Sequence, residues 1–120
     1  MMSSGSRESP LLDEEVLITL RRYDLVERLI PRFIAALPAL ITELLEEVAL
    51  GDRQAVYRCA HRLRGMAAQM GARALAGAVG EVEAAATSAS DMRLVCDDES
   101  LSDLSRRTAD LLADIVTEPP

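Results

Sequence analysis

The apolar residues of segment 24–50 recur every three or four positions without a break, and this pattern constrains the fold more than any other feature. Such spacing places them along one face of a helix of more than six turns, which other helices must cover. Pro31 and Pro38 interrupt the helical hydrogen bonding, but they lie near one side of the helix. We expect a kink, or a fresh start near Pro31, and not the end of the helix. The stripe comprises Val26, Leu29, Ile30, Phe33, Ile34, Leu37, Leu40, Ile41, Leu44, Leu45 and Val48.

Three later segments show helical spacing as well. Gly51 and Asp52 predict a tight turn into a helix over 53–70, which ends at Gly71. The next helix, over 73–89, is rich in alanine, so it permits the close approach of a neighbour. A capping box of Ser100 and Asp103 predicts the start of a last helix, whose stripe runs over 101–115. In the connector before it, three apolar residues are expected to pack as a lid: Met92, Leu94 and Val95.

These segments predict an all-α fold, an up-and-down antiparallel four-helix bundle with a short additional N-terminal helix. The additional helix is expected over 11–20, with acidic residues in its first turn, and covers one end of the bundle. Residues 1–10 are polar and without period, so we expect a disordered leader or linker there. Residues 11–118 are predicted to form one domain.

Composition and charge exclude several classes of function. A net charge of −7 argues against nucleic-acid binding, and no apolar run approaches the roughly 20 residues that a membrane span needs. Cys59 and Cys96 lie far apart and outside any CxxC pair, so neither a disulfide framework nor a metal site is indicated. We expect a cytoplasmic protein with reduced thiols, monomeric, whose natural partner is another protein.

The chain has a single histidine, His61, and helical geometry places it on the outer face of its helix. Successive side chains rotate by about 100°, so His61 lies roughly 140° from the mean direction of the apolar face. Gly65 and Ala68 follow on the same side and leave the imidazole open to an incoming group. Arg64 can swing alongside the ring, where its guanidinium suits an oxyanion such as phosphate. A plain surface histidine beside a solvated arginine is the alternative.

An exposed neutral imidazole is a nucleophile, which suits acceptance of a phosphoryl group. The sequence has no GxxxxGK or GxGxxG loop and no convincing acidic magnesium cluster, so unaided chemistry with ATP is excluded. Gly77 and Gly80 lie within a helical pattern and make no phosphate loop. Cys59 points inward while His61 points outward, so the two form no catalytic pair. We therefore expect most of the catalytic power to come from a partner.

These residues resemble the signature of the histidine-containing phosphotransfer (HPt) domains of two-component phosphorelays, over about residues 12–117. The matching positions are His61, Leu63, Arg64, Gly65, Gly71, Ala72, Leu75, Val82 and Glu83, with Phe33, Pro38, Leu44, Gly51 and Asp52 upstream. The resemblance implies that His61 is the phospho-acceptor, that Arg64 helps to hold the phosphoryl group, and that Gly65 leaves room for the receiver. It also implies that Glu83 holds the imidazole through Nδ1–H and leaves Nε2 to attack, although a solvated Glu83 is the alternative.

Two residues depart from the family pattern. Arg64 stands where lysine is commoner, which preserves the charge while changing reach and geometry. Met66 replaces the usual small residue and points to a flank of the helix, which indicates altered packing or a partner-specific contact.

As a relay intermediate of this kind, the chain would accept a phosphoryl group from a receiver-domain aspartyl-phosphate and pass it to another receiver aspartate, without kinase activity of its own. The resemblance implies response-regulator receiver domains and a hybrid sensor histidine kinase as partners, and Mg²⁺ supplied by the receiver with no cofactor of its own. Tyr57 and Ala68 are candidate docking residues. The rival is a non-phosphorylated helical-bundle module that binds or inhibits a partner protein. The sequence leaves open the cognate receivers, the direction of phosphate flow, and whether the chain is free-standing or the terminal domain of a hybrid kinase.

Overall fold

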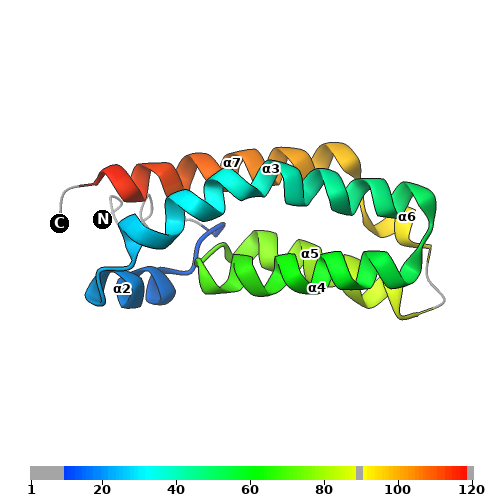
Figure 1. The fold of residues 1–120 in the computed structure, drawn as a ribbon, viewed down its shortest axis with the longest axis horizontal. Coiled ribbons are helices and arrows are strands. Elements are labelled where there is room, and N and C mark those ends of the chain that lie inside the picture. The colour runs from blue at the N-terminus through cyan, green and yellow to red at the C-terminus, as the bar shows by residue number, and fades with distance from the viewer. Residues whose placement is uncertain (1–9, 89–90, 119–120) are drawn as a thin grey trace.

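Four long helices form an antiparallel bundle in the computed structural model, which describes residues 10–88 and 91–118 (Figure 1). Helices α3 (Val26–Leu50), α4 (Arg53–Gln69), α5 (Arg73–Ala86) and α7 (Asp98–Thr117) run up and down in turn, and α7 packs against α3. The shorter helices α2 (Glu14–Arg22) and α6 (Met92–Val95) lie at opposite ends of the bundle (Figure 1). Within the described ranges there is no strand, and no helix is long and apolar enough to cross a membrane. The predicted all-α bundle is confirmed.

Two glycines make the tight turns that join α3 to α4 and α4 to α5. Gly51 and Gly71 have φ angles of 75° and 77°, in the left-handed region that favours glycine. Asp52 then caps α4 by accepting a hydrogen bond from the backbone N–H of Ala55 at 3.1 Å. Both turns are as the sequence predicts, and they make the two helix pairs antiparallel.

Leucine, isoleucine and valine side chains fill the centre of the bundle, while alanines are buried on α4 and α5. The large side chains that are fully buried include Ile30, Leu37 and Leu44 on α3, Leu63 on α4, Leu75 on α5 and Leu112 on α7. Of the buried alanines, five belong to the core cluster, and we call them the alanine seam: Ala60, Ala67, Ala72, Ala85 and Ala86. Because alanine adds little beyond the backbone, α4 and α5 approach closely and form the most extensive helix pair. This pair carries the candidate site.

Helix α2 covers the end of the bundle where α4 turns into α5, as expected, but it spans 14–22 and not 11–20. Asp13 determines this start, because its carboxylate accepts hydrogen bonds from the backbone N–H groups of Glu15 and Val16. The backbone N–H of Asp13 donates to the carbonyl of Gly71 at 2.8 Å, which fastens the segment to the turn. Leu11 and Leu12 are therefore apolar cover and not helix, and residues 1–9 of the expected leader lie outside the described residues.

The boundaries on either side of α6 differ from those expected. Helix α5 ends at Ala86, where the hydroxyl of Thr87 donates to a carbonyl of the last turn; residue 89 lies outside the described ranges. The capping box at Ser100 and Asp103 is wrong, because α7 begins at Asp98. Asp97 is its N-cap and accepts hydrogen bonds from both the backbone N–H and the hydroxyl of Ser100.

Helix α6 supplies only part of the expected lid. Met92 is buried, whereas Leu94 is 85 % exposed and Val95 is 38 % exposed. In a helix of a single turn, three closely spaced side chains point in different directions, so they cannot all face the core. The expectation is therefore confirmed for Met92 and wrong for the other two.

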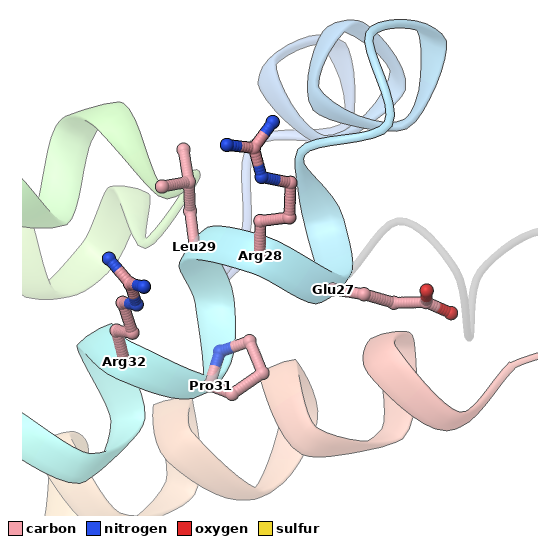
Figure 2. A pocket seen from close by; sticks show the side chains of 5 residues that line it. All are labelled: Glu27, Arg28, Leu29, Pro31 and Arg32. Atoms are coloured by element: carbon pink, nitrogen blue, oxygen red, sulfur yellow. The ribbon is translucent and has the colours of Figure 1, made fainter.

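Helix α3 runs unbroken through both of its prolines, so the fresh start considered near Pro31 does not occur. Packing of the apolar stripe holds the helix together across the hydrogen bonds that proline cannot donate. A hollow of about 360 Å³ lies beside Pro31 and is lined by Glu27, Arg28, Leu29 and Arg32 as well (Figure 2). Figure 2 shows the two arginines on the same side as Leu29, with Pro31 pointing away from them.

Candidate functional site

His61 lies in the middle of α4, and 58 % of its side chain is exposed. This is the outward orientation expected from helical geometry. One turn further on, a Cβ atom added to Gly65 would meet nothing within 4 Å, and Ala68 beyond it is exposed. The approach to the imidazole from its C-terminal side is therefore open.

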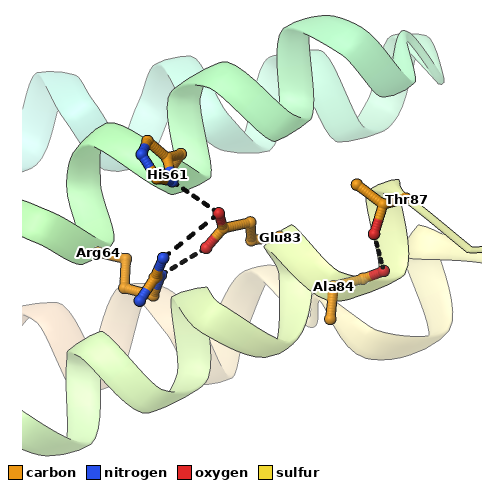
Figure 3. Close-up of polar contacts among 5 residues, drawn as sticks. All are labelled: His61, Arg64, Glu83, Ala84 and Thr87. Atoms are coloured by element: carbon orange, nitrogen blue, oxygen red, sulfur yellow. Dashed lines mark hydrogen bonds and ion pairs between the residues drawn. The ribbon is translucent and has the colours of Figure 1, made fainter.

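Glu83 of α5 reaches across to His61 and engages one of its two ring nitrogens (Figure 3). Its Oε2 lies 2.7 Å from His61 Nδ1, and only 12 % of the glutamate side chain is exposed. Burial acts to raise the pKa of Glu83, but hydrogen bonds from Arg64 and His61 outweigh it, and the pKa lies below its ordinary value. The carboxylate thus accepts a hydrogen bond from Nδ1–H, which leaves Nε2 for an incoming group. Glu83 is not a solvated glutamate.

Arg64 binds the same carboxylate from the other side. Its Nε donates to Glu83 Oε1, and its Nη2 lies 3.5 Å from Oε2 (Figure 3). The hydrogen bond to Glu83 raises the pKa of Arg64, so the guanidinium is fully charged. The structure therefore places the guanidinium on Glu83, and not alongside the imidazole ring as expected from the sequence.

Tyr57 stacks on His61 from the preceding turn of α4. The two ring centroids are 5.6 Å apart and the planes differ by 15°. Tyr57 is also 38 % exposed, so the same side chain that supports the imidazole remains accessible at the surface. Its docking role stays a prediction.

Gly80, which was not predicted as a site residue from the sequence, lies against the side chain of Arg64. A Cβ atom added to Gly80 would stand 3.1 Å from Arg64 Cδ. Gly80 also belongs to a hollow of about 300 Å³ whose other lining residues are Tyr57, Arg64, Glu83, Ala84 and Thr87. The one available signal was a glycine in the middle of an alanine-rich helix, where it costs about 1 kcal/mol relative to alanine.

The remaining sequence candidates lie away from this cluster. Cys59 is buried on the inner face of α4, and burial raises the pKa of its thiol. Met66 is partly buried and packs against the core, as its position on the helix flank indicates. In the part of the chain that the structure describes, no three histidine, cysteine, aspartate or glutamate side chains are grouped to hold a metal ion.

Comparison with known proteins places this arrangement in a family. In fold, the chain resembles the crystal structure of histidine-containing phosphotransfer protein B from Pseudomonas aeruginosa, with a TM-score of 0.80. The two sequences are 24 % identical, and the alignment covers 94 % of this chain and 100 % of that one. A search of curated protein sequences found no match. The profile of the Hpt domain matches residues 28–117, which contain His61, Arg64 and Glu83, and the chain therefore belongs to the Hpt family of phosphotransfer domains.

Proposed function

We propose that His61 is the phospho-acceptor of a phosphorelay intermediate. Its Nε2 receives a phosphoryl group from the aspartyl-phosphate of a receiver domain and later transfers it to the aspartate of another receiver. The observation that carries this proposal is the pair formed with Glu83, in which an exposed imidazole has its Nδ1 engaged by a largely buried carboxylate. Such a ring is already oriented for attack through its other nitrogen.

In the accepting step, the lone pair of His61 Nε2 forms a bond to phosphorus while the bond from phosphorus to the aspartate oxygen breaks. The aspartate leaves as a carboxylate, and the proton on Nδ1 stays in place. The ring gains positive charge as the new bond forms, and the Glu83 carboxylate 2.7 Å from Nδ1 stabilises that charge. In the donating step, a carboxylate oxygen of the second receiver's aspartate forms a bond to phosphorus while the phosphorus–nitrogen bond breaks, and the electron pair of that bond returns to Nε2.

The partner is proposed to contribute what this surface lacks. A response-regulator receiver domain would bring the aspartate that donates or accepts the phosphoryl group, together with the Mg²⁺ ion. A hybrid sensor histidine kinase would act upstream, and all of these proteins would work in the cytoplasm. Gly65 and Ala68 leave space for the receiver beside the imidazole, and Tyr57 offers it an exposed aromatic edge. This chain acts as a monomer and supplies the nucleophile, its orientation and the docking surface.

The test is incubation with a receiver domain that carries a labelled aspartyl-phosphate. We expect an acid-labile, alkali-stable label on this chain, as phosphohistidine gives, and its loss in His61→Gln. His61 is largely exposed, so the variant keeps the fold, which circular dichroism checks. Glu81→Gln is the matched control, because Glu81 is an exposed residue of α5 outside the contacts of His61, and this variant should label normally.

Two outcomes would contradict the proposal. One is a label that persists in His61→Gln, because phosphorylation would then occur at another residue. The other is tight binding to cognate receivers with no label on the wild-type chain. That second result would favour the rival function, a helical module that binds or inhibits its partner without being phosphorylated.

A further inference from the structure

The contact between Arg64 and Glu83 is a fork that joins two atoms of each side chain. Nε and Nη2 of the guanidinium approach Oε1 and Oε2 of the carboxylate, and Oε2 is also the atom that engages His61 Nδ1. A two-point contact fixes the plane of a carboxylate, which a single hydrogen bond leaves free to rotate. Arg64 and His61 thus bind the same carboxylate from two sides.

The path that Arg64 takes to Glu83 passes over Gly80. Arg64 follows His61 by three residues on α4, and Gly80 precedes Glu83 by three residues on α5, so each pair lies on one side of its helix. A Cβ atom at Gly80 would stand 3.1 Å from Arg64 Cδ, closer than ordinary van der Waals contact. Cδ is bonded directly to Nε, the atom that donates to Glu83. A displacement of Cδ therefore acts one bond away from the contact between Arg64 and Glu83.

We infer that Gly80 and Arg64 are positioning residues for His61: Gly80 leaves the space that the Arg64 stem occupies, and Arg64 holds the Glu83 carboxylate against Nδ1. The inference rests on the proposed function for its purpose, since a fixed Nδ1–H keeps Nε2 as the attacking nitrogen. It assigns Arg64 a role in the unphosphorylated protein, before any phosphoryl group arrives. It also accounts for arginine at this position, because lysine has one nitrogen and cannot form the fork.

The chain offers a matched pair of glycines to test this. Gly77 and Gly80 are both in α5, but a Cβ at Gly77 would meet nothing within 4 Å. Alanine at either position gives the same gain in helix propensity, and only Gly80→Ala crowds Arg64. His61 is the only histidine, so ¹⁵N-histidine labelling reports on this ring alone. Long-range ¹H–¹⁵N spectra at a pH where the ring is neutral give the ratio of its two tautomers without any phosphate.

We expect Gly80→Ala to lower the ratio of the Nδ1–H to the Nε2–H tautomer by about tenfold, the size expected when a charge-assisted hydrogen bond is weakened. Gly77→Ala should leave the ratio unchanged. In an Arg64→Ala background the ratio should already be low, and adding Gly80→Ala should change it no further. Arg64→Lys should give an intermediate ratio, because the single ammonium nitrogen can still donate to the carboxylate but cannot engage both of its oxygens as the guanidinium does.

Equal ratios in Gly80→Ala and Gly77→Ala would overturn the inference. So would a Gly80→Ala effect that persists at full size in the Arg64→Ala background, because it would then act by another route. The tautomer ratio requires no receiver domain. A wild-type chain that shows the expected tautomers but accepts no phosphoryl group would refute the proposed function and leave the positioning roles standing.

Discussion

Replacing Gly65 with alanine should change stability and phosphoryl transfer in opposite directions. Gly65 lies in the middle of α4, and an added Cβ would meet nothing within 4 Å, so the methyl group causes no clash in the isolated protein. Alanine is favoured over glycine inside a helix by about 1 kcal/mol. We therefore expect the free energy of unfolding to rise by that amount and the melting temperature to rise by about 4 °C.

Transfer should become slower for a steric reason that appears only in the complex. Gly65 is one turn beyond His61 on the same side of the helix, where the proposed receiver must bring its aspartate to Nε2. A misplacement of about 1 Å between reacting groups can cost on the order of 100-fold in rate. One methyl group should cost about 10-fold by this measure, and Gly65→Gln should cost more.

The two effects are measured by urea denaturation and by rapid-quench transfer from a labelled receiver. Gly77→Ala is the control, because it adds the same methyl to an equally open helical site on α5, six residues before Glu83. It should stabilise the protein equally and transfer at the wild-type rate. If Gly65→Ala and Gly65→Gln both transfer as fast as Gly77→Ala, the open space beside the imidazole is not where the receiver docks.

Three other predictions concern charge, burial and the turns. Glu83→Gln should slow transfer about tenfold relative to the exposed control Glu81→Gln, because an amide accepts a weaker hydrogen bond than a carboxylate. Burial acts to raise the pKa of Glu83, but hydrogen bonds outweigh burial and lower it. The contribution of Glu83 to stability is therefore complete above about pH 4.3 and is lost as the pH falls through the folded-state pKa. Urea denaturation from pH 7 to pH 3 should show that the stability advantage of the wild type over Glu83→Gln disappears only in that low-pH range. Burial raises the pKa of Cys96 from 9.0 to about 11, so iodoacetamide should alkylate it about 100-fold more slowly at pH 8 than an ordinary thiol, and a free-cysteine rate would contradict this. Gly71→Ala should lower the free energy of unfolding, measured in urea, by about 1–3 kcal/mol, and by more than Gly51→Ala does. The reason is that a Cβ added at Gly71 comes within 3.1 Å of Leu17 in α2, whereas at Gly51 the nearest atom is at 3.9 Å. Equal losses in the two variants would show that the contact with α2 is unimportant.

The helices and the outward direction of His61 could be predicted because both depend on periodicity within one segment. The apolar stripe of α3 specifies its buried face, and the same geometry places His61 on the opposite face of α4. Helix ends were less predictable. Asp97 and Ser100 are both residue types that cap helices, and only the structure shows that the carboxylate of Asp97 accepts from a free backbone N–H of the first turn. Two possible N-caps for α7 lie only three residues apart, and the apolar spacing does not distinguish between them.

The role of Gly80 could not be predicted, because it depends on a contact between two helices. Nothing in the sequence of α5 shows that the stem of Arg64 crosses it, and a glycine among alanines has several possible causes. Likewise, Arg64 is three residues from His61 in sequence, which indicated a contact with the ring. The family resemblance implied the contact of Glu83 with the imidazole, but only the packing of α4 on α5 shows that the Arg64 guanidinium binds the same carboxylate.

The alanine seam has a consequence for how this domain tolerates change. A glutamate side chain has a fixed length, so the distance between the backbones of α4 and α5 decides whether Glu83 can reach His61 at all. That distance is set by buried methyl groups that take no part in the chemistry. A larger residue in place of Ala60 or Ala67 would push α4 and α5 apart. His61 and Glu83 would then lose contact, although every site residue would still be present in the sequence. The function of this bundle therefore depends partly on core side chains being small.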